Sequence, residues 1–94
     1  MNDFFASLGK RWREAAERRG AAITEPELDP TVASELLELA RVAAHTKERR
    51  FAPLATYTAG IAAERLRVAK GADHGTIAAF IREIREEIER ESPV

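Results

Sequence analysis

A histidine and a group of cations are the side chains in this sequence best suited to chemistry. His45 is followed closely by Lys47, Arg49 and Arg50, and Arg41 lies about one helical turn before it. Neighbouring arginines can hold a phosphate or a carboxylate through bidentate hydrogen bonds. The cluster therefore predicts one of two things: an anion-binding junction between two helices, or an exposed basic turn that a neighbouring glutamate dilutes.

The position of His45 on its helix limits its role. A helical wheel with about 100° per residue places His45 roughly 160° from the centre of the leucine stripe, beside Glu38 and Arg41. It is therefore not a core histidine. Three roles stay open: capping the end of the helix, where a cation suits the helix dipole, binding a ligand or partner, or catalysis. The last would need a second catalytic group, which the sequence does not supply.

Recognised catalytic motifs are absent from the sequence. It contains no glycine-rich phosphate loop, no G-x-S-x-G and no H-E-x-x-H. Because there is no cysteine, disulfides, thiolate catalysis, iron–sulfur clusters and zinc–thiolate sites are excluded. With only two histidines, a self-contained transition-metal site is not expected either. We therefore expect no catalytic residue, no metal and no tightly bound cofactor.

Length and composition indicate one small domain. The 94 residues, 45% of them hydrophobic and 33% charged, predict a soluble, globular helical domain over residues 1–94. The formal net charge of −1 and the pI near 6.1 argue against a nucleic-acid binder, whose domains are usually basic. There is no apolar run of membrane-spanning length and no signal-peptide pattern, so we expect a cytoplasmic protein without a membrane partner.

Hydrophobic periodicity predicts four helices, over residues 3–19, 30–46, 53–70 and 75–91, and no strand. Gly20 ends the first helix, and residues 21–29 have the composition of a linker. Asp29 and Pro30 are a typical helix start, and Pro53 is expected to begin the third helix. This pattern predicts an all-α fold, a small four-helix bundle of up-down topology. Dimerisation would complete it if 94 residues do not close the core.

Each helix carries an apolar stripe that we expect to be buried. The stripe of the second helix is widened on one side and comprises Val32, Leu36, Leu37, Leu39, Ala40, Ala43 and Ala44. In the third helix, which we expect to lie centrally, the apolar face comprises Leu54, Tyr57, Thr58, Ile61 and Val68. Arg65 falls within that face, so its head group should either reach past the end of the bundle or pair with a carboxylate. We expect Tyr57 and Trp12 to be core or interface residues.

One segment of the chain resembles a small bacterial helical domain family. The run LLELARVAAHTKERRFAPLATYTAGIAA, residues 36–63, matches its pattern at Glu38, Arg41, His45, Arg49 and the Ala-Pro-Leu that follows. Thr46 and Arg50 depart from it, because the family commonly has glycine and proline there. Members of this family occur alone, or fused or adjacent to the molybdenum-cofactor guanylyltransferase. The resemblance implies a helper in the biogenesis of molybdenum cofactor or of a molybdoenzyme such as formate dehydrogenase.

These observations lead to a hypothesis of a non-enzymatic binding or adaptor module. Its surface would be the basic helix junction, formed by Arg41, His45, Arg49 and Arg50 with Glu38 and Tyr57. By the resemblance, the partner is a molybdoenzyme or guanylyltransferase with an acidic surface, or a phosphate-bearing ligand such as a molybdopterin-type cofactor. The alternative is a purely structural helical subunit or a homodimer that packs on a larger complex. That alternative predicts an exposed apolar face, on Phe4, Phe5 and Trp12 or on the outside of the third helix.

Overall fold

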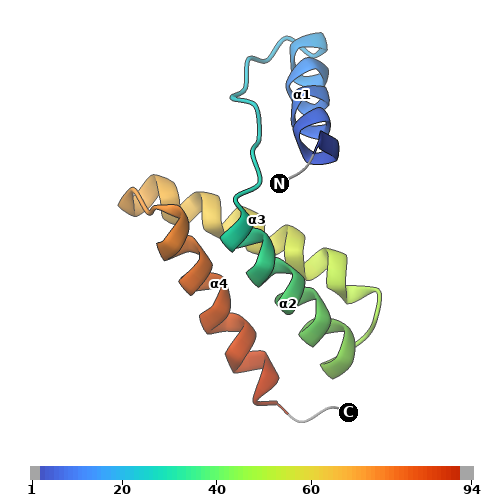
Figure 1. The fold of residues 1–94 in the computed structure, drawn as a ribbon, viewed down its shortest axis with the longest axis vertical. Helices are drawn as coiled ribbons and strands as arrows, with labels where there is room; N and C mark the ends of the chain where they lie inside the picture. Colours follow the sequence, from blue (N-terminus) through green and yellow to red (C-terminus); the bar gives the residue numbers. More distant parts are fainter. Residues whose placement is uncertain (1–2, 92–94) are drawn as a thin grey trace. The chain divides into compact units, whose positions relative to one another are not determined.

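The computed structural model describes residues 3–91, which form four α-helices and no β-strand (Figure 1). They are α1 (Asp3–Arg18), α2 (Pro30–Thr46), α3 (Phe51–Lys70) and α4 (His74–Glu89). The predicted all-α fold class with four helices is confirmed, and most helix ends lie within two residues of the predicted ones. The chain divides by its contacts into two compact units, Met1–Pro30 and Thr31–Val94. The prediction of one domain over residues 1–94 stays a prediction.

Glycines and an aspartate set the ends of three helices. Gly20 and Gly71 adopt the left-handed conformation, with φ of 79° and 67°, which glycine reaches at little cost. The Gly71 amide donates to the Arg67 carbonyl at 2.7 Å and so closes the last turn of α3. At the start of α4, Asp73 is an N-cap that accepts a hydrogen bond from the Thr76 amide at 2.8 Å. The helix-ending glycines and the helix-capping aspartate therefore act as their residue types predict.

The start of α3 differs from the prediction by two residues. The helix begins at Phe51, and the amides of Phe51 and Ala52 donate to the carbonyls of Glu48 and Arg49 at 3.0 and 3.2 Å. Pro53 is thus in the first turn rather than at its first position. The first amides of a helix have no partner within the helix, so a proline there costs no hydrogen bond. Pro53 therefore predicted the first turn of α3 correctly but not the residue at which the helix begins.

In the first unit, the linker packs closely on α1. The backbone at Gly9 lies so near the Pro26 carbonyl oxygen that an added Cβ would overlap it. Arg13 Nε donates to the Glu25 carboxylate at 3.2 Å, a second tie between helix and linker. Residues 21–29 therefore follow a defined path although they form no regular structure.

The core of the second unit is built from three helices. Leu39 of α2 and Ile77 and Ile81 of α4 are buried together, and the residues of α3 packed against them are its alanines, Ala55, Ala59 and Ala63. The stripe predicted for α2 is right at Leu39 and Ala43 but wrong at Leu37, whose side chain is 69% exposed. The stripe widens instead towards Val42 and Thr46, which are buried on the other side.

Ion pairs between α2 and α4 show how these two helices run. Glu35 accepts from Arg82 at 2.9 Å, Arg41 reaches Glu89 at 3.3 Å, and Lys47 reaches Glu91 at 2.6 Å. Residue numbers rise together in both helices, so α2 and α4 are parallel and α3 returns between them. The second unit is therefore an up-down-up arrangement, as in a small bundle.

Candidate binding surfaces

Three of the five basic side chains at the helix junction, counting Lys47 with Arg41, His45, Arg49 and Arg50, have carboxylate partners. Arg41 bonds Glu38 at 3.0 Å and Glu89 at 3.3 Å, and these two hydrogen bonds raise the pKa of its guanidinium. Reciprocally, the pKa of Glu89 is lowered by hydrogen bonds from Arg85 and then Arg41. Because Glu89 comes from the last turn of α4, a segment far away in the sequence neutralises part of the junction's charge.

The other cations of the junction divide into paired and unpaired ones. Lys47 pairs with Glu91 at 2.6 Å, and Arg50 forms an ion pair with Glu48. Arg49 and His45 are exposed, and neither makes a hydrogen bond or ion pair with another side chain in the described part of the chain. Of the residues predicted to bind an anion together, the structure thus joins Arg41 to Glu38 and leaves Arg49 and His45 open to solvent.

Tyr57 takes no part in the ion pairs of these cations. No hydrogen bond or ion pair connects its ring or hydroxyl to the junction among residues 3–91. Its side chain is 70% exposed, and Leu54 and Val68 are 61% and 71% exposed. These three lie on one side of α3 with the half-buried Ile61 and the exposed Arg65. We call Leu54, Tyr57, Ile61, Arg65 and Val68 the outer face of α3.

The outer face corrects the packing predicted for α3. On a helical wheel its centre lies about 160° from the centre of Ala55, Ala59 and Ala63, so the helix turns its small residues inward and its large ones outward. Alanines let α3 approach α2 and α4 closely, which large side chains at those positions would prevent. Arg65 does lie within the apolar stripe as predicted, but the stripe is exposed and Arg65 needs no buried partner.

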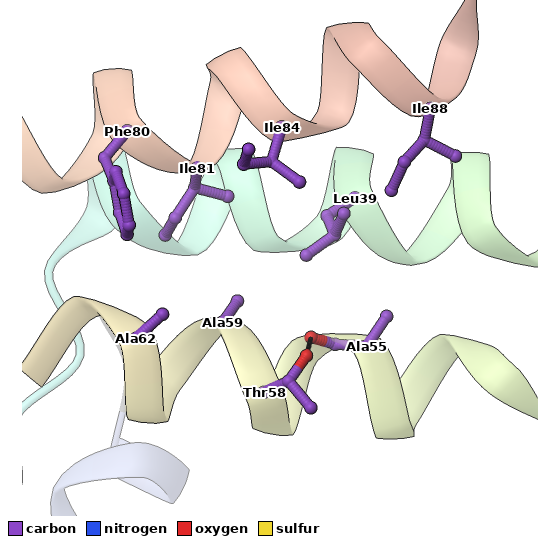
Figure 2. Close-up of a pocket in the computed structure, with 9 residues that line it drawn as sticks. All are labelled: Leu39, Ala55, Thr58, Ala59, Ala62, Phe80, Ile81, Ile84 and Ile88. Carbon is purple, nitrogen blue, oxygen red and sulfur yellow. Dashed lines mark hydrogen bonds between the residues drawn. The ribbon is translucent and has the colours of Figure 1, made fainter. Parts of the chain in front are cut away.

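A groove between α3 and α4 is the clearest hollow of the second unit. Its volume is about 240 Å³, and it is lined by Leu39, Ala55, Thr58, Ala59, Ala62, Phe80, Ile81, Ile84 and Ile88. Figure 2 shows the large side chains of α4 pointing towards the alanines of α3, with Leu39 of α2 between the two rows. The only polar side chain of this lining, Thr58, donates its hydroxyl to the Ala55 carbonyl at 2.8 Å. We call this hollow the α3–α4 groove.

The rim of the α3–α4 groove is acidic on the side of α4. Ile84 at its edge is 40% exposed. Glu83 and Glu87 lie beside Phe80 and Ile84 at helical spacing, and both are exposed. Neither carboxylate makes an ion pair with a described residue. On the side of α3, a more open hollow of about 450 Å³ is lined by Thr58, Ile61, Ala62 and Arg65. It shares Thr58 and Ala62 with the groove, and Ile61 and Arg65 with the outer face defined above.

The first unit has an apolar hollow of its own. It is lined by Phe5, Leu8, Gly9, Trp12, Pro26, Glu27 and Leu28. Phe4 and Trp12 are 63% and 56% exposed, and the rings of Phe4 and Phe5 meet edge to face at 5.0 Å. Trp12 is therefore not a core residue.

The described residues offer no metal centre and no membrane helix. Among residues 3–91 no three histidine or acidic side chains come together to hold a metal ion. In the same range no helix has the length and apolarity needed to cross a bilayer.

Comparison with known proteins identifies the family. Residues 6–93 match the model of the domain of unknown function DUF6457. The chain belongs to this family. No curated protein and no solved structure is detectably similar to it. The match spans both compact units, so the DUF6457 domain includes α1 and its linker as well as the core of α2, α3 and α4.

Sequence and structure agree on some of the exposed residues and differ on others. Glu38, Arg41, His45 and Arg49 do lie off the core stripe, as predicted. The α3–α4 groove was not predicted, and an exposed apolar face on the outside of the third helix was predicted only by the alternative hypothesis. The sequence feature that could have predicted these surfaces is the distribution of apolar residues in α3. Alanines lie on one side of this helix and large apolar residues on the other.

Proposed function

We propose that this DUF6457 chain is a non-catalytic binding module that takes an amphipathic helix of a partner protein into the α3–α4 groove. The observation that supports this most strongly is the groove itself, an apolar hollow between a row of alanines and a row of large apolar side chains. Helix-in-groove recognition uses apolar anchors at helical spacing, and this lining suits such anchors.

Size and chemistry favour a side chain over a free small molecule. Typical small-molecule pockets hold roughly 300–1,000 Å³ and carry several converging polar groups. This groove has about 240 Å³, and its one polar lining side chain is occupied within its own helix. It therefore suits one or two large apolar side chains of a partner.

Charge on the rim favours a basic partner helix. Glu83 and Glu87 lie beside the α4 rim of the groove and form no ion pair among the described residues. A helix that buries its apolar anchors here would place its flanking positions against these carboxylates. Lysine or arginine at those positions gives charge complementarity, which increases specificity and the rate of association.

The family resemblance supplies the first partner to test. Because relatives of this pattern occur beside or fused to the molybdenum-cofactor guanylyltransferase, we propose that enzyme, or a molybdoenzyme, as the protein that carries the helix. The role would be that of an adaptor in cofactor or molybdoenzyme biogenesis.

Binding is measured by calorimetry with two probes, the guanylyltransferase and a Leu/Lys amphipathic model helix. We expect Ala62→Phe, which fills the groove, to weaken both interactions by about tenfold or more, or about 1.4 kcal/mol. The matched control is Ala79→Phe, on an exposed side of α4 away from the groove. If neither probe binds the wild type, the groove is not a helix site. If only the model helix binds, the site stands and the named partner is wrong.

A second candidate function is anion binding at Arg49. The supporting observation is that Arg49 and His45 are exposed near the start of α3 without ion pairs in the described residues. The ligand would be a phosphate-bearing cofactor of the molybdopterin type or an acidic protein surface. Titration of wild type and Arg49→Ala with guanylylated molybdopterin tests it, and failure of the wild type to bind removes the cofactor as ligand.

A further inference from the structure

The outer face of α3 is an apolar surface that the second unit does not use. Leu54, Tyr57 and Val68 are all more than half exposed, while the opposite side of the helix supplies the core contacts. Folded proteins seldom leave such a contiguous stripe of large apolar side chains open to water, so a stripe like this marks an interaction surface. Its neighbour, the α3–α4 groove, is centred about a quarter turn around the helix.

The sequence spacing of the residues on this face is symmetric, that is, the same from the N-terminal end as from the C-terminal end. Leu54, Tyr57, Ile61, Arg65 and Val68 are separated by three, four, four and three residues. Steps of three and four keep the residues in line on one side of a helix, as in a coiled-coil seam. Ile61 is the centre, and each position before it has a counterpart at the same distance after it.

From this symmetry we infer that the outer face pairs with the outer face of a second copy of the chain, with the two α3 helices antiparallel and the two-fold axis at Ile61. A two-fold interface uses the same patch on both molecules, so the patch must complement itself. Here Ile61 meets its own counterpart, and Leu54 of one copy meets Val68 of the other.

Charge selects the antiparallel register. It places the exposed guanidinium of Arg65 against the ring of Tyr57 in the other copy, where a cation–π contact forms. A parallel register would instead place Arg65 against Arg65, two like charges at the same level. The face is thus complementary to itself in one orientation only.

The absence of cysteine from the sequence allows a direct test of the register. In an otherwise cysteine-free chain, Ile61→Cys should form a disulfide between two copies under mild oxidation, because the residue lies on the axis. Leu54→Cys alone should not, whereas a mixture of Leu54→Cys and Val68→Cys chains should cross-link to each other. Efficient self-cross-linking of Leu54→Cys would overturn the antiparallel register.

Sedimentation over a wide range of protein concentration tests the association itself. The wild type should show a monomer–dimer equilibrium, and Ile61→Glu should stay monomeric because it sets two carboxylates against each other. Arg65→Ala should weaken the dimer by about tenfold, since two exposed cation–π contacts, each worth a few-fold, are lost. The control Arg67→Ala removes an arginine that pairs with Glu64 of its own helix at 2.7 Å, off this face, and should leave the dimer unchanged. A wild type that is monomeric at every concentration overturns the inference. These tests do not depend on the groove.

Discussion

At the scale of single residues, ion pairs decide which charges of the basic junction are available. Arg41, Lys47 and Arg50 each have a carboxylate partner, and two of those partners, Glu89 and Glu91, come from the end of α4. Exposed pairs of this kind contribute little individually, but they fix which side chains face solvent. Two of these pairs, Arg41–Glu89 and Lys47–Glu91, join the end of α2 to the end of α4.

These ion pairs should make the folded state less stable as the pH falls. Hydrogen bonds from Arg85 and Arg41 lower the pKa of Glu89 in the folded state. A lowered carboxyl pKa stabilises the fold above the ordinary pKa of glutamate, and that contribution is lost as pH falls through the folded-state pKa. We expect the melting temperature to fall on acidification, and Glu89→Gln to melt lower than wild type at neutral pH but like wild type in acid. Thermal unfolding across pH measures this.

The matched control is Glu86→Gln, because the Glu86 carboxylate makes no ion pair with a described residue. It should follow the wild type at every pH. A Glu89→Gln variant that keeps the full difference from wild type in acid would show that Glu89 acts through packing instead of charge.

At the scale of elements, sequence predicted where helices begin and end better than which side of a helix is buried. Asp73, Gly20 and Gly71 act locally, so their effects could be predicted from neighbouring residues. The faces of α3 could not, since both of its sides are apolar and only the approach of α2 and α4 decides between alanines and large residues. For the same reason the pairing of Arg41 with Glu89 and of Lys47 with Glu91 could not be predicted, because folding brings the end of α4 beside the end of α2.

Replacing two glycines by alanine tests the packing of the helices, because one replacement should destabilise the local structure and the other should stabilise it. Gly9→Ala should push the linker away from α1, because its Cβ would overlap the Pro26 carbonyl oxygen. Hydrogen exchange in α1 and protease cleavage within residues 21–29 should both become faster.

Gly60→Ala is the counterpart, since a Cβ there meets nothing within 4 Å and the residue lies within α3. Alanine in place of an unconstrained helical glycine should raise the free energy of unfolding by about 0.5–1 kcal/mol, measured by denaturant titration. If Gly9→Ala left linker cleavage unchanged, the close packing of Gly9 on Pro26 would be wrong.

At the scale of the whole molecule, the DUF6457 chain combines a small helical core with surfaces that its own second unit leaves open. We propose that the α3–α4 groove takes a basic amphipathic helix and that the outer face of α3 pairs with a second copy. Both surfaces exist because α3 packs through alanines. A two-fold dimer would present two grooves, so one dimer could engage two partner helices.

The most direct test of the proposed function is to map where a helix binds. A Leu/Lys amphipathic model helix is titrated into the isotope-labelled chain, and amide chemical shifts are followed residue by residue. Binding in the groove predicts that the largest changes lie at Thr58, Ala59, Ala62 and Ile84, with small changes over residues 45–50. Changes concentrated at the basic junction, or no changes at all, would contradict the account.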